Sequence, residues 1–278
     1  MSARILSRGR GSDRLRARRR RSRRRALGAL VVLALLSLFA LVYGLRQEAV
    51  RVSRIQVFGA DAPLAAIAEA DMRGDYLGVI PRDSTFLLPL ARIRADILAA
   101  YPAIAAVSLS RSGFTGLSIR ADRRVPVARW CGAAPSGALA TSSLPDAAGC
   151  YLFDAAGFVF ATTSAELPVN PFVLYEPLSS STSPVGATLS AASRLPAAFD
   201  FARQLGSTFG ASVSAVVIAN GEANDELASG TRVTYVLGDE QNAFTALVSA
   251  RGQLNLADGS LEYVDLRFDG KIYLKKKG

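Results

Sequence analysis

The side chains that could carry out acid–base or nucleophilic chemistry are few and unevenly placed in this sequence. It contains no histidine, and its four lysines, Lys271, Lys275, Lys276 and Lys277, all fall in the last eight residues. A Ser-His-Asp or Cys-His site requires an imidazole, and a Ser-Lys dyad requires a lysine in a folded cleft. Common zinc sites need more Cys and His ligands than two cysteines supply. Carboxylate chemistry is therefore what remains.

The carboxylates form no recognisable catalytic or cofactor motif. Asp71, Asp75, Asp122, Asp154 and Asp265 are scattered, and the sequence has no Asp-Thr-Gly or Asp-Ser-Gly triplet, phosphate-binding loop or GxGxxG motif. We interpret these aspartates as residues of turns and solvated faces. The sequence thus predicts a protein that is not an enzyme and that has no metal site and no cofactor.

The two cysteines, Cys131 and Cys150, offer redox chemistry. They flank a segment of small and turn-forming residues, so a disulfide between them would close a short loop. By the chain-entropy estimate such a bridge stabilises a fold by about 3 kcal/mol. Spacing alone does not prove a bridge, and two free thiols are the alternative.

The net charge of +10 is concentrated at the N-terminus. Residues 1–25 hold twelve arginines and one acid, Asp13, a balance of +11 that leaves −1 for the rest of the chain. The folded part then has no basic excess with which to hold a phosphate backbone, and we expect no nucleic-acid partner. Control of membrane topology is the simplest role for the arginines, with a contact to anionic lipid or nucleic acid as the alternative.

An uncharged apolar segment, residues 26–45, follows the basic tail. It is twenty residues long, lies between Arg25 and Arg46, and has Ser37 as its only clearly polar side chain. A helix of this length covers the ~30 Å hydrocarbon core of a bilayer, so a transmembrane helix is predicted here. A cleaved signal peptide is the alternative, but the run is longer than a usual signal core and no small-x-small cleavage site follows it.

The positive-inside rule orients this segment. Because arginines that precede a span stay in the cytoplasm, residues 1–25 are predicted to form a cytoplasmic tail and residues 47–278 to be translocated. We expect a single-pass protein of the inner or plasma membrane with its C-terminal domains outside the cytoplasm. Both cysteines would then lie in a compartment where they can be oxidised.

Residues 47–130 show strand and helix patterns in the order βααββ. Alternating apolar residues indicate strands, and apolar residues at helical spacing indicate helices. The expected elements are a strand at 50–58 ended by Gly59, helices at 61–70 and 90–101, and a hairpin at 107–122. Two helices on a three-stranded sheet would make an independent domain.

Residues 131–278 carry more strand signal and longer loops. The expected elements are a hairpin at 151–160, a helix at 191–205 capped by Ser190, strands at 212–219 and 231–237, a helix at 240–250, and a closing strand pair at 261–268 and 271–274. Asp269-Gly270 between the last two runs is a strong hairpin signal. The predicted fold class is α+β, with an N-terminal transmembrane helix, a βααββ domain, and a mixed β-rich domain with two helices.

Four short motifs occur in order along these elements. They are Val52-x-x-Ile55-x-Val57-x-Gly59, Arg124-Val125-Pro126-Val127-Ala128-Arg129-Trp130, Tyr151-Leu152-Phe153-Asp154-x-x-Gly157 and Tyr263-Val264-Asp265-Leu266-Arg267-Phe268. With the basic tail and single anchor before them, they resemble the FtsQ/DivIB family of bacterial cell-division proteins over about residues 20–275. The resemblance implies a POTRA-like domain at 47–130 and an FtsQ/DivIB-type β-domain at 131–278. Arg123 departs from the family, which usually has glutamate there.

The resemblance implies a non-catalytic scaffold of the septum-building complex, enriched at the division septum and in contact with other divisome membrane proteins. Its β-domain would bind the translocated ends of small bitopic coiled-coil proteins of the FtsB and FtsL type, which add a strand to the sheet edge. That edge maps onto Arg267, Phe268, Lys271, Ile272, Tyr273 and Leu274. The alternatives are a core or cross-strand pair for Phe268 and Tyr273, and a brace of the sheet for Arg267.

A rival interpretation is a membrane-anchored POTRA-type module of another envelope transport or assembly system. Such a protein would be expected to carry a β-barrel or several POTRA repeats. The sequence predicts neither feature.

Overall fold

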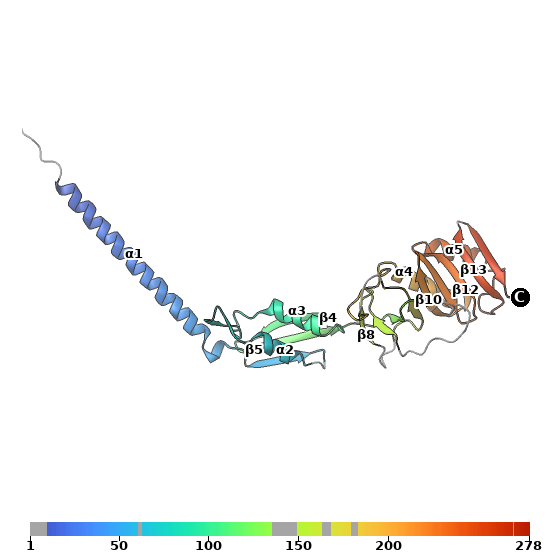
Figure 1. Cartoon of the computed structure of the whole chain (residues 1–278), viewed down its shortest axis with the longest axis horizontal. Coiled ribbons are helices and arrows are strands. Elements are labelled where there is room, and N and C mark those ends of the chain that lie inside the picture. The colour runs from blue at the N-terminus through green and yellow to red at the C-terminus, as the bar shows by residue number, and fades with distance from the viewer. Residues whose placement is uncertain (1–9, 61–62, 135–148, 163–167, 179–182, 269) are drawn as a thin grey trace, which may run out of the picture. The chain divides into compact units, whose positions relative to one another are not determined.

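The computed structural model of the chain describes residues 10–60, 63–134, 149–162, 168–178, 183–268 and 270–278 (Figure 1). The fold is α+β, as predicted: an N-terminal apolar helix precedes mixed sheets, and the described residues contain five α-helices. The chain divides into two compact units. One comprises residues up to Ile97 together with Val107–Ala121, and the other comprises Leu98–Ala106 together with Asp122–Gly278.

Helix α1 (Arg10–Leu45) is continuous and contains the apolar segment. Within its stretch Ser22–Leu45, an 18-residue window reaches a mean hydropathy of 2.6, and none of that window is buried inside the protein. An apolar helix that exposes every face is not stable in water unless another apolar phase covers it. The helix is thus long and apolar enough to act as a membrane anchor or as a signal segment.

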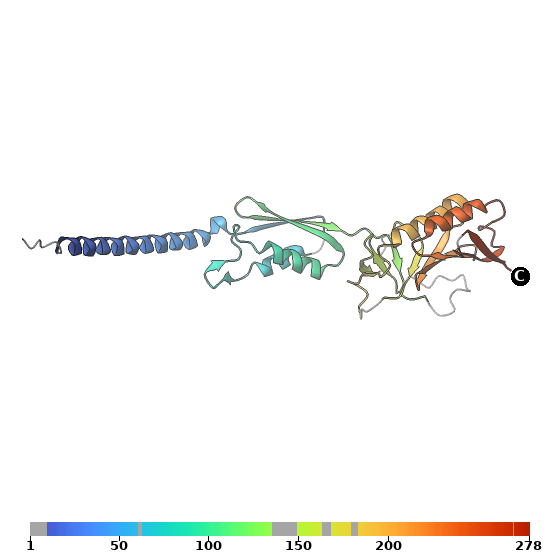
Figure 2. The ribbon, with the colours of Figure 1, turned by 90° about the horizontal axis from the view of Figure 1, so that it is seen from above.

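The first unit contains a three-stranded sheet with strand order β1-β5-β4. The strands are β1 (Arg54–Phe58), β4 (Ile104–Ser112) and β5 (Gly116–Arg123), and β1 runs parallel to β5. Helices α2 (Leu64–Asp71) and α3 (Leu90–Ala100) lie on the same face of this sheet (Figure 2). Leu64, Ile93, Ile97, Leu117 and Ile119 are fully buried between the two layers.

Three short elements of this unit were not predicted. They are the 3-10 helix η1 (Glu48–Val50) and the strands β2 (Asp75–Tyr76) and β3 (Ile80–Pro81), which pair with each other. Gly74 and Pro81 break the longer patterns on which strand prediction depends, so a two-residue strand beside each of them leaves no periodic signal. Helix α2 begins at Leu64, and its predicted opening at 61–62 lies outside the described residues.

A close backbone approach requires glycine at position 59. Gly59 has φ +82°, and a Cβ atom there would overlap the backbone oxygen of Ala121. We expect Gly59→Ala to lower the free energy of unfolding by about 2 kcal/mol more than Gly74→Ala. Gly74 is the matched control because its φ is +85° and nothing lies within 4 Å of its Cβ position. Urea unfolding of both variants measures the difference, and equal losses would contradict the clash.

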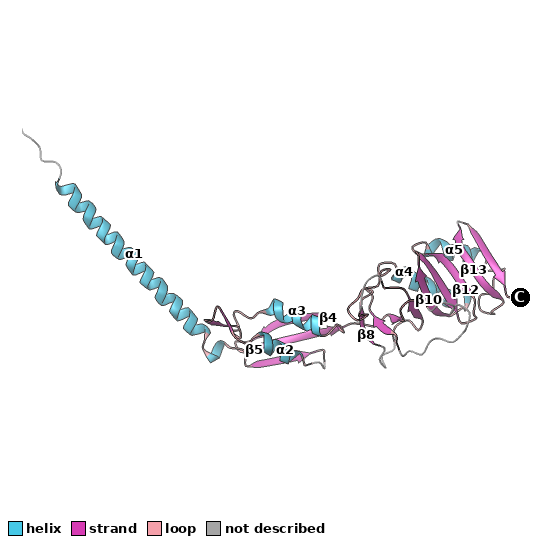
Figure 3. Ribbon diagram, in the orientation of Figure 1, coloured by secondary structure: helices cyan, strands magenta, loops and turns pink. Residues whose placement is uncertain are grey.

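The second unit contains a nine-stranded mixed sheet with the order β14-β13-β12-β11-β10-β9-β6-β7-β8 (Figure 3). Strands β6 and β9, β9 and β10, and β12 and β13 are parallel neighbours, and the other neighbours are antiparallel. The strands are β6 (Ala128–Trp130), β7 (Tyr151–Phe153), β8 (Val159–Thr162), β9 (Val173–Tyr175), β10 (Val213–Ala219), β11 (Glu222–Leu227), β12 (Arg232–Val236), β13 (Leu261–Phe268) and β14 (Lys271–Lys276).

Two helices, α4 (Leu195–Phe209) and α5 (Glu240–Ser249), lie side by side on one face of this sheet (Figure 2). Phe201 of α4 packs on Tyr235 of β12 with ring centroids 4.3 Å apart, in the centre of the core. Helix α4 begins later than the predicted residue 191. Ser190 does not cap it, because its hydroxyl donates a hydrogen bond to Glu176 Oε1 instead.

Candidate functional site

Strand β14 forms one end of the nine-stranded sheet. It pairs antiparallel with β13, with Asp265 opposite Tyr273 and Val264 opposite Leu274, and no described strand pairs with its other side. The backbone N–H and C=O groups on the outer side of an edge strand have no sheet partner, so an edge is a ready template for a further strand. This edge coincides with the residues onto which the family resemblance maps partner binding.

Aromatic side chains accompany this edge. Phe268 and Tyr273 contact each other edge to face, with ring centroids 5.1 Å apart, while about half of each side chain stays exposed. Leu274 is also exposed, whereas Ile272 packs against the core beneath the helices. The rings thus form a cross-strand pair and also offer apolar surface, which are the two roles considered for them.

Arg267 braces the sheet beside this edge. Its guanidinium donates to Asp265 Oδ2 at 2.7 Å and, across β12, to Glu222 Oε1 of β11 at 2.9 Å. These bonds raise the pKa of Arg267, and the bond from Arg267 lowers the pKa of Asp265. Because its donors are already engaged, Arg267 positions the strands that support the edge.

The lysines at this edge are exposed. Lys275 Nζ lies 2.7 Å from Glu262 Oε2, and the hydrogen bond to Glu262 raises the pKa of Lys275. Lys277 Nζ donates to the backbone oxygen of Ser229 at 3.3 Å, and Lys271 is also exposed. Cations along an edge strand disfavour indiscriminate pairing with other strands, so these lysines protect the edge against aggregation.

Two of the five scattered aspartates, Asp71 and Asp265, are buried and were wrongly interpreted as residues of solvated faces. Asp71 pairs with Arg92 at 3.0 Å, and burial raises its pKa. Asp154 lies in the turn between β7 and β8, as predicted, where its Oδ1 accepts hydrogen bonds from the amides of Ala156 and Phe158. Asp154 and Asp265 are held by arginines, whereas Asp75 and Asp122 are exposed as expected. The arginine partners lie far away in the sequence or within a strand, where no local pattern indicates them.

Arg124 is the first residue of the motif at 124–130, and it connects this motif to the hairpin of β7 and β8. Its guanidinium forms an ion pair with Asp154, donates to the backbone oxygen of Pro102 at 2.9 Å and stacks 4.1 Å from the ring centroid of Phe158. Two of the four motifs that carry the family resemblance are therefore in direct contact. The contact explains why an arginine and an aspartate occur at those positions.

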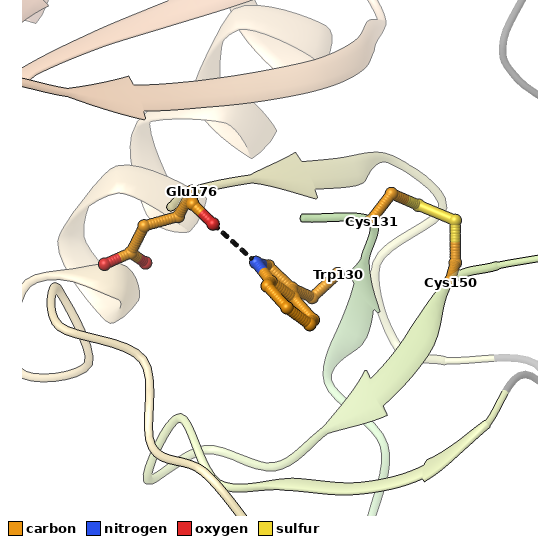
Figure 4. The surroundings of a disulfide bond; sticks show 4 residues. All are labelled: Trp130, Cys131, Cys150 and Glu176. Atoms are coloured by element: carbon orange, nitrogen blue, oxygen red, sulfur yellow. Dashed lines mark hydrogen bonds between the residues drawn. A yellow bond between two sulfur atoms is a disulfide. The ribbon is translucent and has the colours of Figure 1, made fainter. Parts of the chain in front are cut away.

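Cys131 and Cys150 form a disulfide, with their Cα atoms 4.2 Å apart (Figure 4). Cys131 follows β6 and Cys150 precedes β7, so the bridge extends the antiparallel pairing of Trp130 with Tyr151. The Trp130 indole N–H donates to the backbone oxygen of Glu176 at 2.9 Å. A disulfide indicates that this unit lies outside the cytoplasm.

A buried carboxylate in β11 was not predicted. Asp225 is completely buried, accepts a 3.4 Å hydrogen bond from the Tyr235 hydroxyl, and has no partner for Oδ2. Burial, followed by the charges of Glu226 and Glu240, raises the pKa of Asp225 well above its ordinary value, and the Tyr235 bond only partly opposes this. The core therefore favours the protonated acid.

Replacement of Asp225 by asparagine should stabilise the protein at neutral pH. Because the folded-state pKa is raised, the folded state is penalised as pH rises above the unfolded pKa of ~3.9. We expect Asp225→Asn to increase the free energy of unfolding at pH 7.5 by about 1–3 kcal/mol, and by less as pH falls toward 4. Urea unfolding across this pH range tests the prediction, with exposed Asp122→Asn as control. A gain that is independent of pH would contradict it.

No site for a metal was found within the described ranges, where no three His, Cys, Asp or Glu side chains gather. A scan against models of known protein families finds no match to this chain, and a search of curated proteins finds no matching relative.

Proposed function

We propose that this chain is a membrane-anchored, non-catalytic scaffold of the FtsQ/DivIB type that binds small bitopic division proteins through β14. The observation that carries the proposal is the sheet edge itself. An exposed edge strand next to half-exposed Phe268 and Tyr273 is suited to the addition of a strand from a partner. The arginine brace behind it keeps the edge in a fixed register.

The physical basis of this interaction is strand addition. A partner segment in extended conformation would satisfy the outer backbone groups of β14, and its alternate side chains would contact the exposed apolar ones. Aromatic side chains that are already partly buried in the free protein lose little conformational freedom on binding. They are therefore suited to be binding hot spots. Phe268, Tyr273 and Leu274 would supply most of the affinity.

The location follows from the N-terminal helix and the disulfide. Helix α1 would anchor the chain in the inner or plasma membrane, with its arginine-rich start in the cytoplasm and residues 47–278 outside. Small bitopic coiled-coil proteins of FtsB and FtsL type carry their partner segments on the same side. Enrichment at the division septum would follow from these contacts.

Copurification tests the proposal. The full chain, tagged at its N-terminus, is solubilised from membranes of the source cells and recovered, and its partners are identified by mass spectrometry. The proposal expects small proteins with one membrane span followed by a coiled coil. Recovery of outer-membrane or transport components instead would favour the rival POTRA-bearing systems and overturn the division role.

A further inference from the structure

One turn of the first unit carries a residue that its backbone conformation does not favour. Residues 77–79 link β2 to β3, and the Val79 amide donates to the Tyr76 oxygen at 3.0 Å. Leu77 and Gly78 are the central residues of this turn, and both have positive φ, +52° and +69°. Positive φ at both central turn positions is favoured by Asn-Gly, and a leucine there costs conformational energy. The chain uses Asn220-Gly221 for the corresponding turn between β10 and β11, and Leu77 and Asn220 are the only non-glycine residues with positive φ among those described.

Folding does not explain the leucine. Leu77 is 97% exposed, so its side chain gains almost nothing by packing within the protein. A residue that is both strained and unpacked points to a contact outside the chain.

The same end of the unit carries more exposed apolar side chains. Phe114, in the turn between β4 and β5, is 70% exposed, and Val79, Phe86 and Leu87 are also exposed. Hydrogen bonds hold these segments together: the Thr85 hydroxyl donates to the Phe114 oxygen at 2.5 Å, and Arg111 donates to the Phe86 oxygen at 3.2 Å. We call Leu77, Val79, Phe86, Leu87 and Phe114 the apolar tip.

The apolar tip is fixed beside the end of the apolar helix. Arg46, the first residue after α1, donates from Nε to the Val79 oxygen at 3.0 Å. The Thr85 amide donates to the Val50 oxygen at 2.9 Å, four residues further along the chain. The tip therefore lies where α1 would leave the bilayer.

The charge around the tip matches an anionic surface. The segments that carry it, residues 46–54, 73–87 and 111–116, contain six arginines and three acids. Apolar side chains surrounded by basic ones are typical of surfaces that lie in the headgroup region of a membrane.

We propose that the apolar tip inserts into the outer leaflet of the membrane that α1 spans, next to the anchor. The inference rests on the anchor that the proposed function includes, but not on any protein partner. Leu77 and Phe114 would enter the boundary between headgroups and acyl chains, while the neighbouring arginines contact phosphate groups. The first unit would then be held at the membrane at two points instead of one.

The test uses the full chain in liposomes of phosphatidylethanolamine and phosphatidylglycerol that contain a nitroxide-labelled lipid. The variants Leu77→Cys, Phe114→Cys and Phe58→Cys are each labelled with an environment-sensitive dye, since the native cysteines are joined to each other. Phe58 is the control because it is half-exposed and lies away from the apolar tip. The Ser53 amide, just before β1, donates to the Thr115 oxygen beside the tip, whereas Phe58 is at the opposite end of β1. We expect quenching and blue-shifted emission at positions 77 and 114 but not at 58.

A second variant separates membrane contact from folding. Leu77→Asn should suit the turn at least as well as leucine, so the thermal unfolding transition should hold or rise. Quenching of the label at position 114 should nevertheless fall in this background. Unchanged quenching would overturn the role of Leu77.

The outcomes distinguish this inference from the proposed function. Flotation of the chain with liposomes without quenching at 77 and 114 would overturn the inference alone, whatever copurification shows. Failure to float would overturn the anchor and the inference with it. If the dyes at positions 77 and 114 show blue-shifted emission only after solubilised membrane proteins are added, the tip contacts a protein and the lipid contact is overturned.

Discussion

Replacement of Phe268 and Tyr273 by glutamate is expected to reduce recovery of the bitopic partner by roughly 30-fold or more, since a binding hot spot contributes about 2 kcal/mol or more. Each glutamate would place a charge on the apolar part of the edge and leave it desolvated against the partner strand. Quantitative copurification of the full chain from membranes measures the loss.

A matched control keeps this result interpretable. Val169→Glu introduces the same charge at an apolar residue that is 69% exposed in the same unit, but next to β6 instead of β14. It should leave recovery unchanged. If both variants lose the partner equally, the effect is one of charge or folding, and the edge is not the site. Circular dichroism of each variant verifies the fold.

Removal of the disulfide is expected to lower the free energy of unfolding of the second unit by about 3 kcal/mol, because the bridge closes a loop between residues separated by 19 positions. The variant is Cys131→Ser with Cys150→Ser, in residues 47–278. Trp130, the single tryptophan of the chain, is buried beside the bridge, so its fluorescence reports the unfolding.

Reduction provides the control for this prediction. A reducing agent should lower the urea midpoint of the wild type to that of the double-serine variant and should not alter the variant. An unchanged midpoint in the variant would mean that the loop is already constrained by the pairing of β6 with β7.

The order of the larger elements could be predicted because each has its own periodic pattern. Helices α3 and α5 and the closing pair β13–β14 lie close to their predicted ranges. Gly270 of the predicted Asp-Gly turn has φ +65°, and Asp269 lies outside the described residues. Strand β14 lies at one end of the sheet order. No local sequence pattern specifies that a strand will lie at an edge.

Strand β11 was missed because four of its six residues, EANDEL, are polar. Ala223, Asp225 and Leu227 alternate inward, but a buried aspartate mimics a turn residue when only the sequence is considered. The role of Arg267 as a brace depends on Glu222, 45 residues earlier. Contacts between distant strands are tertiary, so composition and spacing do not reveal them.

The most direct test of the scaffold proposal is photocrosslinking at position 273 in dividing cells of the source organism. A photoreactive phenylalanine analogue replaces Tyr273 in the full chain, and the same analogue at Val169 serves as control. The proposal predicts a covalent adduct with a small bitopic coiled-coil protein at position 273 and none at 169. No adduct at 273, or the same adducts at both positions, would contradict a partner-binding role for β14.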